Sequence, residues 1–185
     1  GKLTGWIGYT LSWTMMQFDS LNFGRKFYAR YDRRHDISIV ALYKLSEKIN
    51  FSGTWVYGTG NAVTLPLSEY PAYYHNFRGI TDYDPSNPNP GGHPGHEMWF
   101  SANEFGEKNN FRMNPYHRLD IGVQFHKKKQ WGERIWEISV YNTYCRFNPF
   151  FYYSEKETIN NKDYGVLRQV SLFPVIPSVT YSFKF

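Results

Sequence analysis

The sequence predicts an all-β fold, an antiparallel transmembrane β-barrel with about eight strands in this chain. Aromatic residues make up 20% of the 185 residues, yet the mean hydropathy is only −0.59. The segments that carry the aromatics alternate apolar and polar side chains with a period of two, which indicates strands with one apolar and one polar face. This combination is typical of transmembrane barrels, whose strands alternate lipid-facing and lumen-facing residues.

The C-terminal segment PSVTYSFKF has the most regular alternation. One side of this predicted strand carries Val179, Tyr181, Phe183 and Phe185, and the other side carries only serine, threonine and lysine. The last residues of a domain usually fray unless another element holds them. An unbroken alternation up to the last residue therefore indicates a paired strand.

The same period recurs along the chain, at residues 5–16, 36–45, 51–58, 118–126, 134–142, 150–155 and 166–173. Short connections are expected at 46–50 and 127–133, and longer ones at 18–33 and 60–113. In outer-membrane barrels the periplasmic turns are short and the outer loops are long. The last two expected connections fit this rule poorly, because residues 155–164 would form a fairly long turn on the inner side and PVI would form a short loop on the outer side.

Residues 60–113 contain most of the prolines, including the run DPSNPNPGGHPGHE, and are predicted to form one large extracellular loop. An aromatic cluster beside an arginine in this loop is a possible ligand-contacting surface, or it packs the loop against itself; its members are Tyr70, Tyr73, Tyr74, Phe77 and Arg78. His93, His96 and Glu97 could bind a metal, but no helix fixes their spacing, so we expect no metal.

Several classes of function find no support in the sequence. No apolar run of 18 residues predicts a membrane-spanning helix, and GKLTGWIGYT has no signal-peptide pattern, so the start of an exported protein would have been removed. The single Cys145 excludes an internal disulfide framework and is expected to be a structural thiol. No nucleophile, phosphate-loop or hydrolase motif indicates an enzyme or a cofactor.

The formal net charge of +5 could indicate a nucleic-acid partner. However, the basic residues are scattered along the sequence, apart from Lys127, Lys128 and Lys129, and no RNA- or DNA-binding motif accompanies them. We therefore expect no nucleic-acid partner.

Six segments, in this order, resemble the C-terminal barrel of TonB-dependent outer-membrane receptors of the Bacteroidetes type that carries a carboxypeptidase-like regulatory domain: GWIGYTLSW, DRRHDISIVALYKLS, GTWVYGTGNAVTLP, NPYHRLDIGVQF, ISVYNTYCRFNPFF and VSLFPVIPSVTYSFKF. The terminal Val179, Tyr181, Phe183 and Phe185 resemble the signal that the barrel-assembly machinery reads. The resemblance covers nearly the whole chain apart from the large loop.

The resemblance implies that this chain is the last part of a 22-stranded barrel in the bacterial outer membrane, with its C-terminus in the periplasm. Such a receptor takes up a scarce nutrient with energy delivered through TonB. The plug domain, which contacts TonB, and the earlier strands are absent from this sequence. The implied partners are outer-membrane lipid, the assembly machinery, the plug and remaining strands, and a possible surface lipoprotein.

Two strand entries carry an arginine and an aspartate two residues apart, namely Arg34 with Asp36 and Arg118 with Asp120. In each pair both side chains fall opposite the aliphatic residues, on the lumen face of the predicted barrel. Charge on the lipid side near mid-bilayer costs roughly 2–4 kcal/mol. We therefore expect a polar network along the lumen wall, although direct contact with a ligand is also possible.

Two alternatives remain open at this stage. A complete eight-stranded barrel with a structural or adhesive role would fit the length, since eight strands can close around their own side chains. A soluble β-sandwich that binds a ligand through its aromatic loop would also alternate. Aromatic rings near the strand ends (Trp13, Trp55, Tyr57 and Trp136) favour a membrane interface over the sandwich.

Overall fold

Six antiparallel strands form the largest sheet in the part of the chain that the computed structural model describes, which is residues 1–74 and 98–185. Their order is β1-β4-β5-β10-β11-β14. Their bounds are Leu3–Leu11 (β1), His35–Lys44 (β4), Ile49–Gly58 (β5), Tyr116–Lys129 (β10), Gly132–Tyr141 (β11) and Ile176–Lys184 (β14). The predicted all-β, antiparallel fold is confirmed.

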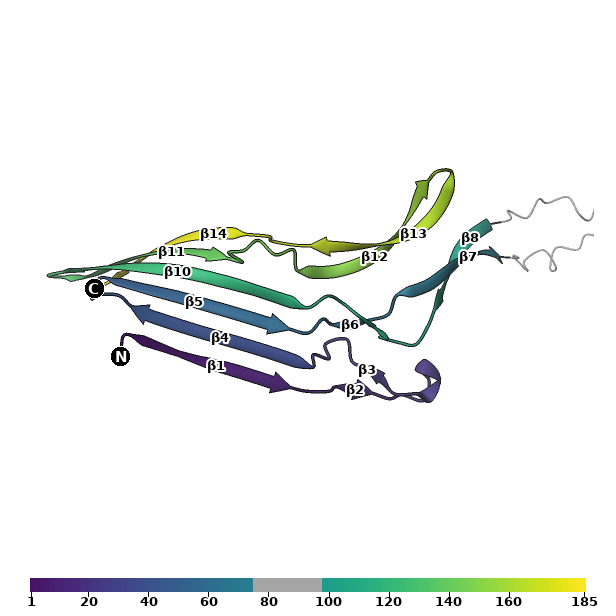
Figure 1. Cartoon of the computed structure of the whole chain (residues 1–185), viewed down its shortest axis with the longest axis horizontal. Coiled ribbons are helices and arrows are strands. Elements are labelled where there is room, and N and C mark those ends of the chain that lie inside the picture. The colour runs from purple at the N-terminus through teal and green to yellow at the C-terminus, as the bar shows by residue number, and fades with distance from the viewer. Residues whose placement is uncertain (75–97) are drawn as a thin grey trace, which may run out of the picture.

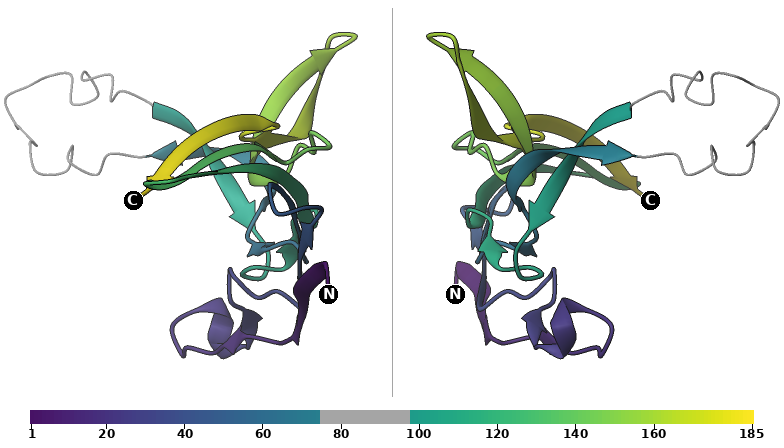
Figure 2. Two further views of the ribbon diagram at one scale, coloured as in Figure 1. Left: turned by 90° about the vertical axis from the view of Figure 1, so that its left-hand side faces the viewer. Right: turned by 90° about the vertical axis from the view of Figure 1, so that its right-hand side faces the viewer.

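The sheet is open. Its edges are β1 and β14, and the described residues do not close it into a barrel. Viewed end-on, the sheet is curved and its two edges lie apart (Figure 2). The structure therefore contains an antiparallel wall with two free edges.

The two ends of the sheet differ. Residues 45–48 and 130–131 make short turns at one end, where both chain termini also lie (Figure 1). Residues 12–34, 59–115 and 142–175 join the strands at the other end. We call these the short-turn end and the long-connection end.

Smaller elements form within the long connections. β2 (Met15–Met16) pairs with β3 (Phe27–Tyr28) around the 3-10 helix η1 (Asn22–Gly24), and β6 (Ala62–Val63) pairs with β9 (Phe111–Arg112). Two longer hairpins project beyond the sheet (Figure 1). They are β7 (Pro66–Tyr74) with β8 (Met98–Phe105), and β12 (Pro149–Ile159) with β13 (Lys162–Ser171).

The prediction of one large loop over residues 60–113 is wrong for residues 66–74 and 98–105, which pair as β7 and β8. β7 tolerates Pro66 and Pro71 because each strand of a two-stranded hairpin has one edge that needs no partner. The predicted turn at 127–133 is also shorter than expected. Residues 127–129 continue β10 and only 130–131 turn.

Residues 150–155 and 166–173 were expected to be wall strands, and this expectation is wrong. β11 pairs directly with β14, and β12 and β13 pair only with each other. Residues 142–175 are therefore a single connection at the long-connection end. The predicted inner turn at 155–164 is also wrong, because residues 155–159 and 162–164 belong to β12 and β13 and only residues 160–161 turn.

Candidate functional site

The first candidate surface is one face of the six-stranded sheet. The strand register places one apolar residue from each strand in a single transverse row: Leu3, Tyr43, Phe51, Val123, Ile138 and Val179. The flanking residues on this face are also mostly apolar, among them Ile7, Ile39, Trp55, Ile121 and Tyr181. Ile7 is 74% exposed and Val179 is 64% exposed. We call this surface the apolar face.

The opposite side of the sheet is mostly polar, although Trp6, Val40 and Val56 also lie on it. The neighbouring transverse row consists of Thr4, Leu42, Ser52, Gly122, Ser139 and Ser178. All but one of these residues are small or polar. We call this side the polar face.

Aromatic and imidazole rings border the apolar face at both ends. At the long-connection end the Tyr9 hydroxyl lies 2.9 Å from Nδ1 of His35, and the Tyr144 hydroxyl lies 2.7 Å from Nδ1 of His117. At the short-turn end the ring of Trp136 lies 4.8 Å from that of Tyr181. An apolar band between two aromatic rows is typical of strands that cross a bilayer.

The four residues of the predicted assembly signal follow the apolar face. Val179 and Tyr181 stand opposite Ile138 and Trp136 on β11. The ring of Phe183 lies 5.9 Å from that of Phe185, which is fully exposed beyond the end of β14.

A polar network follows the polar face near the long-connection end. Arg118 lies 3.0 Å from a carboxylate oxygen of Asp120 and donates hydrogen bonds to the hydroxyls of Tyr116 and Tyr141. Asp120 also accepts the backbone N–H of Asn142 at 2.9 Å. Every charged group in this network therefore has a partner on a neighbouring strand or turn.

Two further polar contacts continue along this face. Gln124 donates to Glu137 at 2.8 Å, and His126 lies 3.0 Å from both Glu133 and Asn50. These contacts join β5, β10 and β11.

The other predicted pair, Arg34 with Asp36, is arranged differently. Asp36 pairs with Arg33 at 3.5 Å, whereas Arg34 donates to the Tyr28 hydroxyl at 2.6 Å. β4 begins at His35, so the alternation that was expected to place Arg34 beside Asp36 does not extend to Arg34. Asp36 itself lies on the polar face, opposite Gly58.

A compact core lies in the long connections and not under the sheet. Its buried members are Phe27, Ala29, Asp32, Ala62 and Met113, which we call the loop core. Gly60 packs so closely against the backbone of Met113 that a Cβ atom there would clash. The long connections are thus tightly packed against one another at this point.

Asp32 is fully buried in the loop core. It accepts the backbone N–H of Thr14 at 2.5 Å and forms an ion pair with Arg112. Burial raises the pKa of Asp32, but the bonds from Thr14 and Arg112 outweigh it, and the pKa lies below its usual value. Asp32 therefore stays ionised and links residues 12–34 to β9.

Asn142 anchors the connection that leaves β11. It is almost fully buried with a positive φ of 52°, which asparagine tolerates better than most residues. Its side-chain amide donates to the carbonyls of Arg146 and Pro174. Asn142 thereby holds the beginning of the 142–175 connection beside its end, where the chain enters β14.

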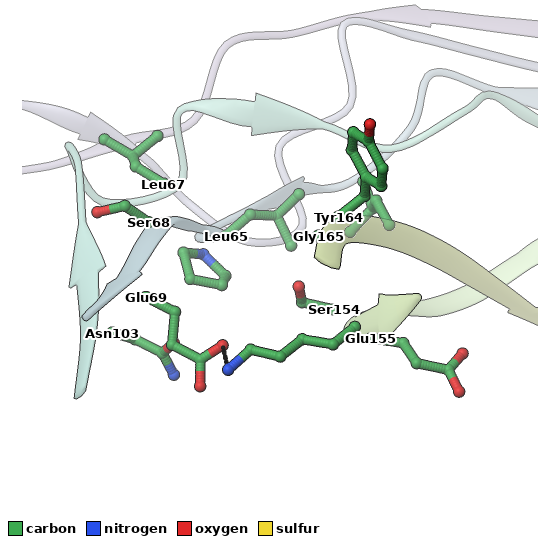
Figure 3. Close-up of a pocket in the computed structure, with 12 residues that line it drawn as sticks. Leu65, Leu67, Ser68, Glu69, Asn103, Ser154, Glu155, Tyr164 and Gly165 are labelled. Atoms are coloured by element: carbon green, nitrogen blue, oxygen red, sulfur yellow. Dashed lines mark ion pairs between the residues drawn. The ribbon is translucent and has the colours of Figure 1, made fainter. Parts of the chain in front are cut away.

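A cleft of about 740 Å³ lies between the two projecting hairpins. Glu69 of β7 and Asn103 of β8 line one side, and Ser154, Tyr164 and other residues of β12 and β13 line the other (Figure 3). The Lys156 side chain crosses the cleft, and its ammonium nitrogen lies 3.0 Å from a carboxylate oxygen of Glu69. The cleft therefore offers hydroxyl, amide and charged groups beside the apolar side chains of Leu65, Leu67 and Leu167.

The predicted ligand-contacting residues fall only partly within the described structure. Tyr70 is exposed on β7, and Tyr73 and Tyr74 belong to the same strand. Phe77 and Arg78 lie outside the described residues, as do His93, His96 and Glu97. The sequence reasoning missed Glu69 and Lys156, because nothing in the sequence indicated that residues 87 positions apart face one cleft.

The described residues give little support to a metal site or to a reactive cysteine. Cys145 is free and exposed in the turn after β11. Within residues 1–74 and 98–185, no group of three or more His, Cys, Asp or Glu residues could hold a metal ion. In the same ranges no helix is long and apolar enough to cross a membrane. No family model, curated protein or solved structure matches this chain.

Proposed function

We propose that this chain forms part of the wall of a transmembrane β-barrel in a bacterial outer membrane. The observation that carries the proposal is the apolar face. It is exposed across six strands, bordered by aromatic rings at both ends, and backed by a polar face. The strands have 9 to 14 residues, and a tilted strand needs roughly 9–11 residues to cross a bilayer.

The open edges favour a segment of a wide barrel over a small closed one. β1 and β14 both lack an outer neighbour within the described residues. An unpaired edge cannot remain in lipid, because each unsatisfied backbone group costs several kcal/mol. Because β1 and β14 lie apart in the described structure (Figure 2), we propose that further strands pair with both, as a larger barrel would supply.

Within such a barrel, we propose the role of the C-terminal segment of a TonB-dependent receptor for active uptake of a scarce nutrient. The family assignment rests on the resemblance of the six ordered sequence segments. The loop core and the cleft between the projecting hairpins would lie outside the membrane, where a nutrient is captured. The polar network of Arg118 and Asp120 would face the plug or water in the lumen.

A charge placed on either face tests the membrane proposal. Ile138 and Ser139 are adjacent on β11 but lie on opposite faces. We expect Ile138→Lys to lose roughly 2–4 kcal/mol of stability in the membrane, whereas Ser139→Lys, the matched control, folds like the wild type. The measurement is the fraction of protein that stays in outer membranes after urea extraction. Equal losses in both variants would contradict the proposal.

Intact mass tests the receptor role. The protein that carries this sequence would be purified from detergent-solubilised outer membranes and weighed by mass spectrometry. We expect a mass several times the 21.9 kDa of this chain, because the plug and the other strands belong to the same polypeptide. A mass near 21.9 kDa would overturn the receptor assignment in favour of a small barrel.

A further inference from the structure

The short-turn end of the sheet is strongly basic. It carries eight cationic side chains and two acidic ones, Glu47 and Glu133. The cations are Lys2, Lys44, Lys48, Lys127, Lys128, Lys129, Arg134 and Lys184, which we call the basic rim. The rest of the chain has 13 Lys and Arg against 14 Asp and Glu. The positive charge that is scattered in the sequence is therefore gathered at one end by the fold.

The tip of β10 and β11 projects furthest at this end (Figure 1). β5 begins at Ile49 opposite Phe125, whereas β10 continues to Lys129. The backbone N–H of His126 donates to the carbonyl of Lys48 at 2.8 Å, so the turn at 45–48 lies directly beside the start of the Lys127–Lys129 run. The two turns thus form one basic surface.

Aromatic rings lie among these charges and continue the apolar face. Trp131, at the tip, is 61% exposed, and its ring lies 5.2 Å from that of Phe183. The Arg134 guanidinium lies 5.6 Å from the centroid of the Trp131 ring. Lys127 stands opposite Arg134 on the same side of the sheet. The cations therefore begin where the apolar face ends.

We propose that the basic rim binds the phosphate headgroups of anionic phospholipids in the leaflet at the short-turn end. This inference rests on the proposed membrane location. Tryptophan rings settle at the level of the headgroups, and lysine stems cover apolar surface while their ammonium groups reach outward. Clustered lysines beside a membrane span attract anionic lipid. A soluble polyanion could bind the charges, but it would not explain why the cations directly adjoin the apolar face.

The test is a lipid competition on the detergent-purified protein that carries this sequence. Native mass spectrometry would count phosphatidylglycerol and phosphatidylcholine retained from an equimolar mixture. We expect the wild type to retain more phosphatidylglycerol. The preference should fall by about fivefold for each lysine removed in Lys127→Gln/Lys128→Gln/Lys129→Gln, and it should weaken as salt is added.

The matched control is Lys26→Gln/Lys108→Gln/Lys162→Gln, which removes the same charge from exposed positions elsewhere. This variant should keep the wild-type preference. Equal retention of the two lipids by the wild type, or an equal loss in the control, would overturn the inference. So would binding of a DNA oligonucleotide without any lipid preference, which would assign the rim to soluble polyanions. The Ile138→Lys comparison tests membrane location separately, so the two failures can be told apart.

Discussion

Asp32 is a fully buried carboxylate, yet it lies in a connecting segment and not in the sheet. It links the segment before β4 to Arg112 on β9, 80 residues later in the chain. The pKa of Asp32 lies below its usual value, so its ionised form stabilises the fold above the ordinary aspartate pKa of 3.8. That contribution is lost as the pH falls through the lower pKa of the folded state.

We expect Asp32→Asn to open the loop core without unfolding the sheet. Removing one partner of a buried ion pair costs about 3 kcal/mol, because Arg112 keeps its charge. Amide hydrogen exchange of residues 12–34, read by mass spectrometry, should accelerate. As the pH falls below 3.8, the wild type should lose protection, after correction for intrinsic exchange rates, and the variant should not.

Asp19→Asn is the control for this change, since Asp19 is an exposed carboxylate in the same connection. It should leave exchange unchanged. Wild-type exchange rates in Asp32→Asn would show that the ion pair does not hold the loop core together.

At the scale of elements, the β12–β13 hairpin lies within the connection between β11 and β14 and does not belong to the six-stranded sheet. β11 pairs with β14 over nine residue pairs, from Glu133 with Lys184 to Tyr141 with Ile176. Asn142 and Asn148 are among the residues that hold the base of this connection. The side-chain amide of Asn148 accepts the N–H of His117 and donates to its C=O. No residue of the hairpin takes part in the backbone pairing of the six-stranded sheet.

We expect a variant in which residues 150–170 are replaced by a short glycine-serine linker to keep the six-stranded sheet. Shortening a surface connection changes its closure entropy only slightly. Outer-membrane level and heat-dependent migration on a gel should match the wild type. Deleting residues 134–139 of β11 is the control, and it should abolish both. Loss of membrane assembly in the hairpin variant would mean that β12 and β13 support the wall.

Period-two alternation located the six strands of the sheet, because most residues on one side of each strand are apolar. The strand expected over residues 5–16 is shorter, since β1 ends at Leu11 and residues 15–16 pair with β3 instead. The same signal could not reveal which strands pair, so β12 and β13 were assigned to the wall. It also missed the ends of strands outside the apolar band, such as Lys127–Lys129, where all side chains are polar. The loop core and the cleft depend on contacts between distant residues, which no local pattern encodes.

At the scale of the whole molecule, the chain divides into two unlike ends around one wall. The long-connection end holds the loop core and the cleft, and the short-turn end holds the basic rim. Between them, the wall exposes its apolar face, and within residues 1–74 and 98–185 the outer edges of β1 and β14 have no partner strand. A free edge of this kind is a template for pairing with another strand. What lies beside β1 and β14 therefore decides the size of the proposed barrel.

Disulfide cross-linking distinguishes a wide barrel from one that this chain closes by itself. Ser139 and Ser178 are direct neighbours on β11 and β14, so a cysteine pair there, in a Cys145→Ser background, should cross-link. Cysteines at Thr4, Trp6, Gly8 or Thr10 of β1, each paired in turn with Ser178→Cys, should not. A disulfide requires Cα atoms within about 7 Å, which a 22-stranded wall would prevent. A β1–β14 cross-link of similar yield would show that the two edges meet, and the wide barrel would then be wrong.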